Sequence, residues 1–421
     1  MPPSEDAAAG TFAGLGLSPA LVDALHAHGY ERPTAIQAAA LPAALSGADL
    51  LASARTGSGK TAAFALGIVA RRLESTARAT TRRTSALVLV PTRELATQVG
   101  EFFMAMARAF PGRFKLAVLA GGVSINPQLM SLRGGADVVV ATPGRLLDVV
   151  DHNALRLDAV ETLVLDEADR LLDAGFADEL SRVLALLPPR RQNLLFSATF
   201  PPAVEALAQG LLRDPVRLAE TSTPTAAPDI AQRAVSVDAA QRTPLLRHLI
   251  RQEGWTRVLV FVATRYAAEH VADKLRRAGV AASALHGEMS QGARTQALRD
   301  FAQDRLQVLV ATDLAARGID IARLPVVVNH DLPRSAVDYI HRIGRTARAG
   351  ERGIAVSFVS AATEAHFRLI EKRQGQRVAR EVVAGFEPVE AAPPAAPGDG
   401  GIKGRRKSKK DKLREAAARS S

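Results

Sequence analysis

A glycine-rich segment with a lysine follows the first strongly apolar run of the chain, Asp49–Ser53. Its sequence is Ala54-Arg55-Thr56-Gly57-Ser58-Gly59-Lys60-Thr61, and an apolar stretch with helical spacing, Ala62–Leu73, comes directly after it. Glycines allow backbone N–H groups to approach phosphate oxygens closely, and the start of a helix adds its positive dipole. Lys60 would reach the β- and γ-phosphates of a nucleotide, and the Thr61 hydroxyl would bind Mg²⁺. The general pattern has Gly where Ala54 stands, so the match is imperfect.

Three carboxylates follow a second apolar run. Asp166-Glu167-Ala168-Asp169 comes directly after Leu163–Leu165, about 105 residues beyond the glycine-rich segment. Carboxylates at the carboxyl end of a buried parallel strand face the ligand crevice of a doubly wound sheet. One of them would hold Mg²⁺, and a second could orient and deprotonate an attacking water molecule. The two segments together predict hydrolysis of a nucleoside triphosphate.

The tetrapeptide Asp166–Asp169 resembles the motif that gives the DEAD-box RNA helicases their name. The other motifs of that family appear in order over about residues 12–350, and the family uses the Ala54 form of the phosphate loop. The resemblance implies an RNA-stimulated ATPase with ATP as substrate, Mg²⁺ as its metal ion, and RNA bound largely through the backbone. It further implies an α/β fold of two tandem RecA-like parallel-sheet domains. Overall resemblance and a short basic tail favour the bacterial RhlE-like branch.

The segment Gly29–Gln37 resembles the Q motif of the family, and Phe12 lies upstream at about the usual distance. The amide of Gln37 has the donor and acceptor that pair with N6 and N7 of adenine. Phe12 and Tyr30 are candidates to sandwich the adenine ring. This segment therefore predicts selection of adenine over guanine.

Further motifs resemble the RNA-contact loops of the family. Hydroxyls, free backbone N–H groups and arginines are groups that bind a phosphodiester backbone. In the first half these residues are Pro91, Thr92, Arg93, Gly121, Gly122, Thr142, Pro143, Gly144 and Arg145. In the second half they are Thr264, Arg265, His286, Gly287, Gln291, Arg294, Thr312 and Asp313.

The remaining motifs imply coupling between two domains. Ser197-Ala198-Thr199 resembles the motif that links ATP hydrolysis to strand separation, although by itself it could be a helix N-cap. By resemblance, Asp320 contacts the ATP ribose, and His341 contacts Asp169 and the Ser197–Thr199 segment across the cleft. Arg342, Arg345 and Arg348 are spaced i, i+3 and i+6, so they share roughly one face if this stretch is helical. Guanidiniums facing a nucleotide form an arginine-finger arrangement, and we expect Arg345 and Arg348 to be catalytic with Lys60, Asp166 and Glu167.

Continuous apolar runs separated by stretches with helical spacing must position these residues. Such runs mark strands buried on both faces, and their alternation with helices predicts a parallel α/β sheet. The alternation stops at residues 220–229, where two prolines among small polar residues predict a linker. We expect domains at residues 1–219 (with the Q motif at about 10–38) and 230–384, and a disordered basic tail at 385–421.

Composition bounds the class of protein. The 421-residue chain has 47% hydrophobic residues and no cysteine, which excludes disulfides, thiolate zinc sites and cysteine nucleophiles. No apolar run approaches membrane-spanning length, and Glu5 and Asp6 argue against a secretory signal. Residues 402–421 hold nine Lys/Arg and two Asp/Glu, so most of the net charge of +11 lies in the tail. We expect a cytoplasmic protein with RNA as partner, no membrane partner, and ribosomal or RNA-decay complexes as further partners.

Two other readings stay open at this stage. One is a DNA-directed helicase or translocase on the same twin-domain scaffold, which the Gln37 and Asp166–Asp169 motifs weigh against. The other is a non-enzymatic RNA chaperone that acts through the basic tail, which the intact Lys60, Glu167 and Arg348 make improbable. Stimulation of the ATPase by RNA, compared with DNA of the same sequence, tests the DNA-directed alternative, because the ribose 2′-hydroxyl distinguishes RNA from DNA.

Overall fold

The computed structural model describes residues 10–53, 58–74, 82–173, 175–218, 230–316, 324–346 and 353–390. Several predicted site residues lie outside these ranges, namely Ala54, Arg55, Thr56, Gly57, Asp320 and Arg348. The predicted linker at 220–229 and residues 391–421 of the predicted tail also lie outside them.

A sheet of seven parallel strands forms the centre of the first half, in the order β3-β4-β2-β5-β6-β1-β7. Its strands are β1 (Leu50–Ser53), β2 (Ala86–Leu89), β3 (Leu116–Leu119), β4 (Val138–Ala141), β5 (Thr162–Asp166), β6 (Gln192–Ser197) and β7 (Val216–Leu218). The central strands β2, β4, β5 and β6 are buried along their whole length. Their continuous apolar sequence follows from this burial, because helices cover both faces of the sheet.

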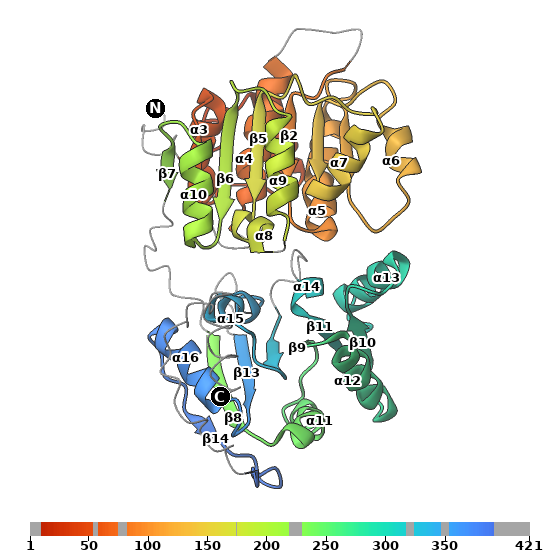
Figure 1. The fold of residues 1–421 in the computed structure, drawn as a ribbon, viewed down its shortest axis with the longest axis vertical. Helices are drawn as coiled ribbons and strands as arrows, with labels where there is room; N and C mark the ends of the chain where they lie inside the picture. The colour runs from red at the N-terminus through yellow and green to blue at the C-terminus, as the bar shows by residue number, and fades with distance from the viewer. Residues whose placement is uncertain are drawn as a thin grey trace, which may run out of the picture.

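Helices form a layer on each face of this sheet (Figure 1). One layer packs Phe64, Phe103 and Leu41 against the sheet, and it contains α3 (Ala35–Ser46), α4 (Lys60–Glu74) and α5 (Arg93–Ala109), with α2 (Pro19–Ala27) beside them. The other layer packs Leu146 and Val204, and it contains α7 (Pro143–Asp151), α8 (Ala168–Asp173), α9 (Ala177–Ala185) and α10 (Pro202–Leu211). The short helix α6 (Asn126–Ser131) lies beside β3.

The second half repeats this architecture with a seven-stranded parallel sheet in the order β10-β11-β9-β12-β13-β8-β14. Its strands are β8 (Ile230–Ser236), β9 (Val258–Val262), β10 (Ala282–Leu285), β11 (Val308–Thr312), β12 (Val326–Asn329), β13 (Gly353–Val359) and β14 (Arg380–Glu381). The helices are α11 (Arg242–Gln252), α12 (Arg265–Arg277), α13 (Gln291–Ala302), α14 (Asp313–Ala316), α15 (Ala336–Ile343) and α16 (Glu364–Gln374), with the 3-10 turn η1 (Ala239–Gln241). The predicted fold class of two parallel α/β sheets is confirmed. In the part of the chain that the structure describes, no helix combines the length and apolarity needed to cross a membrane.

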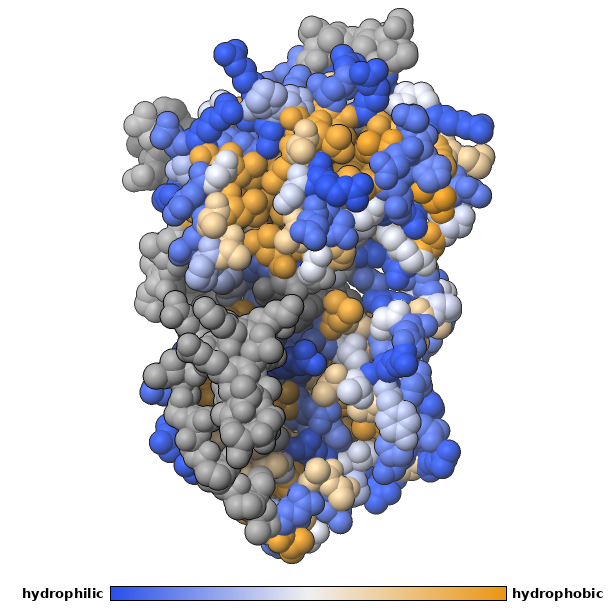
Figure 2. Space-filling view, in the orientation of Figure 1, coloured by the Kyte–Doolittle hydropathy of each residue, from blue (hydrophilic) through white to orange (hydrophobic). Residues whose placement is uncertain are grey.

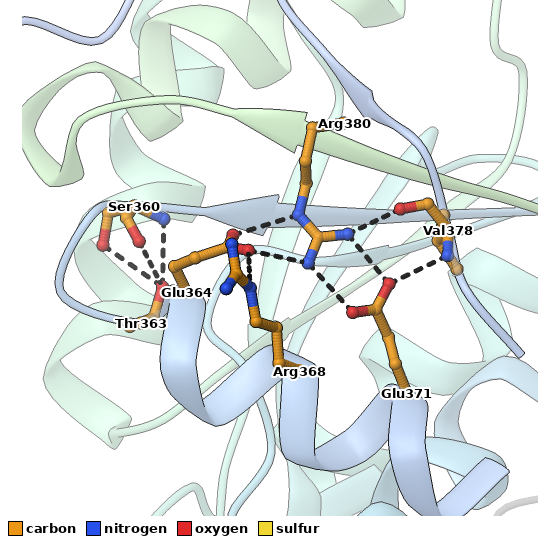
Figure 3. Close-up of polar contacts among 7 residues, drawn as sticks. All are labelled: Ser360, Thr363, Glu364, Arg368, Glu371, Val378 and Arg380. Atoms are coloured by element: carbon orange, nitrogen blue, oxygen red, sulfur yellow. Dashed lines mark hydrogen bonds and ion pairs between the residues drawn. The ribbon is translucent and has the colours of Figure 1, made fainter. Parts of the chain in front are cut away.

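The end of the described chain is tied to the second sheet by a polar network (Figure 3). Arg380 of β14 donates to Glu364 and Glu371 of α16 and to the carbonyl of Val378. Its guanidinium also lies 4.7 Å from the ring centroid of Phe367. Two aligned carboxylates and an aromatic face therefore fix the last strand against the helix that precedes it.

Candidate active site and nucleic-acid interface

The predicted site residues follow the carboxyl ends of the strands and divide into two groups by strand order. In the first sheet, the phosphate loop and the acidic residues follow β1, β5 and β6, which are neighbours, whereas the predicted RNA residues follow β3, β4 and β2. In the second sheet, the predicted RNA residues follow β10, β11 and β9. Parallel strands end at one edge of a sheet, so residues distant in sequence meet there. Each sheet thus brings its RNA set to one half of its edge.

Lys60 and the acidic residues of β5 form a buried cluster. Lys60 Nζ lies 2.7 Å from Asp166 Oδ1 and 3.9 Å from Glu167 Oε1. Arg170, one turn further along, donates to Glu167 Oε2 at 2.9 Å. All four side chains are buried. The structure therefore brings together the three residues predicted to bind phosphate, hold the metal ion and activate water.

Charge balance decides the protonation of this cluster. Burial alone would lower the pKa of Lys60, but Asp166 and Glu167 beside it raise that pKa above its usual value. Burial alone would raise the pKa of Glu167, but Arg170 and Lys60, and then Arg345 and His341 of the second half, lower it. Glu167 is therefore held as a carboxylate, the form that accepts a proton from water.

The backbone around Glu167 is unusual. Glu167 has φ of 54°, in the left-handed region that non-glycine residues seldom adopt, and its N–H donates to Asp166 Oδ1 at 2.9 Å. Residues held in such conformations occur preferentially at functional sites. The turn directs two successive carboxylates into the same cluster.

Asp169 joins the acidic segment to the residues after β6. The N–H and hydroxyl of Thr199 donate to Asp169 Oδ2 at 3.1 and 2.6 Å, and the N–H of Asp169 donates to Ser197 Oγ at 3.2 Å. The Ser197 hydroxyl donates in turn to the carbonyl of Thr199 at 2.7 Å. Ser197 and Thr199 thus contact the acidic segment, and neither caps α10, whose N-cap residue is Pro201.

Gln37 links α3 to the phosphate loop. Its Oε1 accepts from the N–H of Thr34 at 2.9 Å, and its Nε2 donates to the carbonyl of Gly59 at 3.1 Å. The Thr34 hydroxyl donates to the carbonyl of Ser58 at 2.9 Å. Gly59 has φ of 92°, and a Cβ there would lie 2.5 Å from Gln37 Nε2, so only glycine fits. The amide predicted to read adenine is engaged by this loop in the structure.

The predicted aromatic sandwich does not form as expected. Phe12 is 1% exposed and packs in the core of the first domain, so it offers no face to an adenine ring. Tyr30 is half-buried and meets Phe102 edge-on at 5.7 Å between ring centroids. The prediction that Phe12 stacks on adenine is corrected, because its side chain is packed in the hydrophobic core of the first domain.

The donors at this cluster fit Mg²⁺. The Oδ2 atom of Asp166 is buried and has no hydrogen-bond partner in the protein, and Thr61 follows Lys60 in the first turn of α4. Mg²⁺ takes one or two protein oxygens together with phosphate oxygens and water. Within the described ranges, no three acidic or histidine side chains gather into a metal cage.

The second domain presents His341 and Arg345 toward this cluster. A small cleft between the domains is lined by Arg170 of the first domain and by Asp313, His341, Arg342 and Arg345 of the second. Burial lowers the pKa of His341, Arg170 lowers it further, and Asp169 and Glu167 oppose them, which leaves a pKa of about 4. His341 is therefore neutral near pH 7 and lies in the electrostatic reach of Asp169.

Arg342 belongs to the interior of the second domain. Its Nε and Nη2 donate to the two carboxylate oxygens of Asp313 at 2.6 and 2.7 Å, and its Nη1 donates to Asn329 and to the carbonyl of Asp331. The helix α15 ends at Ile343, so Arg345 lies in the turn after it. The predicted fork of three arginines is therefore wrong for Arg342. The carboxylate of Asp313 is paired with Arg342 but its side chain is 28% exposed, so its predicted contact with RNA stays a prediction.

Arg93 and Arg145 hold the glycine pair of the first domain. Arg93 donates to the carbonyl of Gly121 at 3.0 Å, and Arg145 donates to the carbonyl of Val123 at 2.8 Å. Gly122 has φ of 78°, and a Cβ there would lie 2.5 Å from Arg93 Nη1. The three loops after β2, β3 and β4 are thus assembled into one surface by the arginines predicted to bind RNA.

Helices begin at the same loops. Thr92 is the N-cap residue of α5 and accepts from the N–H of Leu95 at 3.3 Å, with Pro91 just before it. Thr142 is the N-cap residue of α7, whose first residues are Pro143 and Gly144, and its hydroxyl does not cap the helix. Helix starts direct N–H groups and positive dipoles toward an anion.

The second domain presents matching groups. Thr264 caps α12 by accepting from the N–H of Ala267 at 3.1 Å, and Thr312 ends β11. Arg265 forms an ion pair with Glu288, beside Gly287, and His286 Nε2 lies 2.8 Å from Glu269 Oε1. The loop after β10 is therefore held against α12. Gln291 and Arg294 lie on α13, which follows this loop.

Glu94 and Arg294 connect the two domains. Arg294 Nη2 lies 2.7 Å from Glu94 Oε1, and both side chains are largely buried, at 6% and 13% exposure. Burial lowers the pKa of Arg93, and the positive charges of Arg294 and Arg145 lower it further against the opposing charge of Glu94. Arg93 of the first domain and Arg294 of the second therefore both lie beside Glu94. The sequence reasoning missed Glu94 and Arg170, and only their positions next to quoted motif residues could have indicated them.

Unpartnered polar atoms gather on this surface. Buried side-chain atoms without a hydrogen-bond partner in the described protein include Arg93 Nε, Arg145 Nε and Nη1, His286 Nδ1, Gln291 Oε1 and Arg294 Nε. Buried polar atoms are usually hydrogen-bonded, so these atoms could bond a ligand, although Arg93 Nε and Arg145 Nε already lie 3.9 and 3.4 Å from carboxylate oxygens of Glu94 and Asp148. All of these belong to residues predicted to bind RNA.

Comparison with known proteins gives a consistent result. A sequence model described as DEAD/DEAH box helicase matches residues 34–207, and one described as Helicase conserved C-terminal domain matches residues 241–350. The chain is 41% identical over 373 residues to the ATP-dependent RNA helicase DeaD of Mycobacterium tuberculosis, covering 89% of this chain and 65% of that relative. The chain thus spans slightly less than two thirds of the length of that relative.

Other relatives are covered more completely. The ATP-dependent RNA helicase DbpA of Escherichia coli is 44% identical over 342 residues, covering 81% of this chain and 73% of the relative. The structure of Saccharomyces cerevisiae Dbp5 bound to RNA and ADP BeF3 superposes with a TM-score of 0.76 at 32% identity, covering 88% of this chain and 95% of that chain. The two sheets, the ordered motifs and these matches agree, and the chain belongs to the DEAD-box family of ATP-dependent RNA helicases.

Proposed function

We propose that this protein is an RNA-stimulated ATPase that uses ATP to separate short RNA duplexes locally or to remodel RNA–protein complexes. The observation that carries the proposal is the position of Glu167. Arg170 of the same domain donates a hydrogen bond to its carboxylate. Arg345 and His341 of the other domain lower the pKa of this carboxylate electrostatically. A water-activating group that both domains influence makes hydrolysis depend on domain closure.

The residues of the cluster have separate tasks in this reaction. Lys60 binds the phosphates, and Glu167 orients the attacking water and accepts its proton. Arg345 and, by resemblance, Arg348 counter the charge that develops on the γ-phosphate. Mg²⁺, when bound by Asp166 and Thr61, supplies charge neutralisation of the phosphates.

RNA would bind at the other half of the carboxyl-end edge of each sheet, where the predicted RNA residues lie. The surface around Arg93, Arg145 and Arg294 is rich in guanidinium and N–H groups, which bind phosphates without reading bases. Because Glu94 and Arg294 pair across the domains, RNA on this surface would stabilise the closed arrangement. Closure then completes the ATPase site, which couples RNA binding to hydrolysis.

The test is hydrolysis of ATP by the purified chain with Mg²⁺, with RNA and with DNA of identical sequence, together with separation of a short RNA duplex. RNA should stimulate turnover and DNA should not. Glu167→Gln should lower kcat by at least about 100-fold, since general-base catalysis contributes that much. Glu161→Gln, an exposed glutamate before the same strand, is the matched control. Lys60→Ala should weaken nucleotide binding as well as turnover.

Two results would replace this proposal. Equal stimulation by DNA would indicate a DNA-directed translocase, and absence of turnover with saturating RNA would indicate an ATP-independent RNA-binding scaffold. Membership of the RhlE-like branch, ribosomal or RNA-decay partners and a cytoplasmic location stay predictions from the sequence. Crosslinking and sequencing of the bound RNA in cells would test the partners.

A further inference from the structure

One aromatic side chain stands apart from all the others in its exposure. The chain has 14 Phe, three Tyr and one Trp, and every one of them lies in the described ranges. Only Tyr266 is an exposed aromatic residue, at 74%. Solitary apolar side chains on a surface are common, so the place of Tyr266 in the fold decides its meaning.

Tyr266 lies in the first turn of α12, at the edge of the second sheet that carries the predicted RNA residues. Thr264 caps this helix and Arg265 begins it. Arg265 and Glu269 of the same helix contact the loop after β10 through Glu288 and His286. Helix α13, which packs on the other face of the second sheet, carries Arg294, which reaches the first domain. Tyr266 therefore directly follows Thr264 and Arg265, two of the residues predicted to bind RNA.

The ring of Tyr266 is held in a defined orientation. His270, one turn along α12, lies with its ring 5.7 Å from that of Tyr266 between centroids, and the two planes differ by 12°. Rings in such an offset stack restrict each other's rotation. A ring that is stacked on one face and largely exposed offers its other face to a further planar group. Figure 2 shows the face over α12 and α13 as mainly hydrophilic.

We propose that Tyr266, backed by His270, stacks on a nucleobase of the bound RNA and extends the RNA-binding surface along α12. This inference rests on the proposed function. A backbone-binding surface places phosphates at the start of α12, and bases project from that backbone within reach of the first turn. Stacking on an aromatic ring accepts any base, because every base has a flat π-face. The contact therefore adds affinity without sequence preference.

RNA is favoured over a protein partner by the chemistry around the ring. The groups near it are Arg265, His270 and the loop at His286, which is polar and partly unpartnered. An apolar protein partner would need a larger apolar area than one ring provides. The proposal therefore commits to single-stranded RNA.

The experiment compares the wild type with Tyr266→Ala, Tyr266→Phe and His270→Ala. The probe is a single-stranded RNA of about twelve nucleotides, bound in the presence of a non-hydrolysable ATP analogue. Leu369→Ala is the matched control, because Leu369 is also an exposed apolar side chain of the second domain, at 61%. Circular dichroism and thermal unfolding confirm that each variant is folded.

Tyr266→Ala should raise the Kd for RNA about fivefold to tenfold, the lower end of measured stacking effects. Tyr266→Phe should bind like the wild type, because the ring is kept, and His270→Ala should fall between. The decisive arm uses RNAs in which one nucleotide at a time is abasic. At one position of the RNA, the missing base should raise the Kd of the wild type by the same factor as Tyr266→Ala does. The Kd of Tyr266→Ala should not change when that base is missing.

Two outcomes would overturn the inference. Equal RNA affinity of the wild type and Tyr266→Ala would show that the ring does not contact RNA. A loss of affinity that is the same for every abasic RNA would show that the ring acts on the backbone or the fold instead of a base. Failure of the proposed function would be distinct, since the wild type itself would then bind no RNA or show no RNA-stimulated ATPase.

Discussion

Among individual residues, burial and neighbouring charges set the chemical state of each functional group. Four buried charged side chains form the cluster around Lys60, and each of them lies beside a side chain of opposite charge. They are Lys60, Asp166, Glu167 and Arg170. An isolated buried charge is costly, whereas a paired one is tolerated. Removal of one member therefore leaves another without its partner, and variants that keep shape but change charge are the most informative.

Gln37 is the first residue whose charge can be changed without changing its shape. Gln37→Glu removes the donor to Gly59 and places a carboxylate beside the carbonyl oxygen. We expect ATP affinity to fall by at least about tenfold, since an unfavourable contact replaces a hydrogen bond. The wild type should strongly prefer ATP to GTP, because guanine has an acceptor at O6 where adenine has a donor. Titration with labelled ATP and GTP measures both.

Thr34→Ser is the control for this variant, because it keeps the hydroxyl that donates to Ser58. It should bind ATP like the wild type. Equal use of ATP and GTP by the wild type would remove Gln37 from the nucleotide-base site.

We expect protonation of His341 to lower the rate of the ATPase at acidic pH. Its pKa is about 4 in the closed cleft because burial and Arg170 disfavour the charged form, whereas a free imidazole has a pKa near 6.5. The proton is therefore bound more tightly when the cleft is open. Closure is fully available above about pH 6.5 and becomes less favourable as the pH falls toward about 4.

The measurement is kcat of the RNA-stimulated ATPase between pH 5 and 8 for the wild type and His341→Gln. The wild type should lose up to about tenfold per pH unit below pH 6.5, and the variant should lose much less. Superimposable profiles would show that another group controls the rate at acidic pH.

Among the elements, the contact between α16 and β14 holds the end of the second domain. Arg380 bridges Glu364 and Glu371, and Glu371 is 4% exposed. Hydrogen bonds from Arg380 are the main cause that lowers the pKa of both glutamates. The element pair therefore depends on one guanidinium (Figure 3).

Arg380→Met should destabilise the protein by about 2–3 kcal/mol, because the aliphatic stem is kept but a buried carboxylate loses its partner. Since both glutamates have lowered pKa values, this stabilisation is present above about pH 4.3, and is lost as the pH falls below it. Urea unfolding at pH 7 and pH 3.5 measures the difference. Arg373→Met, an exposed arginine on the same helix, should change stability little. Equal urea midpoints of unfolding for the wild type and Arg380→Met at pH 7 would show that the contacts of Arg380 with Glu364 and Glu371 do not stabilise the domain.

Across the whole molecule, the pair Glu94–Arg294 joins the two sheets. Glu94→Gln should weaken closure without touching the ATP cluster. We expect the RNA concentration for half-maximal ATPase to rise by about tenfold, as one largely buried ion pair between the domains is lost. Steady-state ATPase measured against RNA concentration tests this.

Arg294→Gln and the double variant complete a cycle for this pair. If the two residues act through each other, the double variant should be no worse than the poorer single variant. Strictly additive losses would show that Arg294 contacts RNA independently of Glu94.

We expect the basic tail to raise the RNA affinity of the whole protein through its charge. Residues 402–421 hold nine Lys/Arg and two Asp/Glu. Removal of the chain after Gly401 should raise the RNA concentration needed for half-maximal ATPase and flatten its salt dependence, at about 0.7 per lost phosphate contact on single strands. Turnover at saturating RNA should change little. An unchanged salt slope would assign the tail to solubility.

The sequence by itself determined the strands and the loops that carry ATP and RNA chemistry. Runs such as Ala86–Val90 and Val138–Ala141 are continuously apolar, because parallel strands are covered on both faces, and the structure has strands there. Ligand loops follow these strands, so residue type and spacing were enough to predict Lys60 and Asp166 as one cluster. Local pattern is sufficient where burial is uniform along an element.

Only the tertiary structure decided which charges meet. The strands β7, β8 and β14 were not predicted, because their partly exposed residues give no continuous apolar run. From the sequence, Arg342 was predicted to belong to a group of arginines facing the nucleotide, whereas in the structure it donates to Asp313. Phe12 was predicted to stack on adenine, whereas in the structure it is buried in the core. Glu94 meets Arg294 across 200 residues. A side chain's partner depends on which distant element folds against it, and no local spacing records that choice.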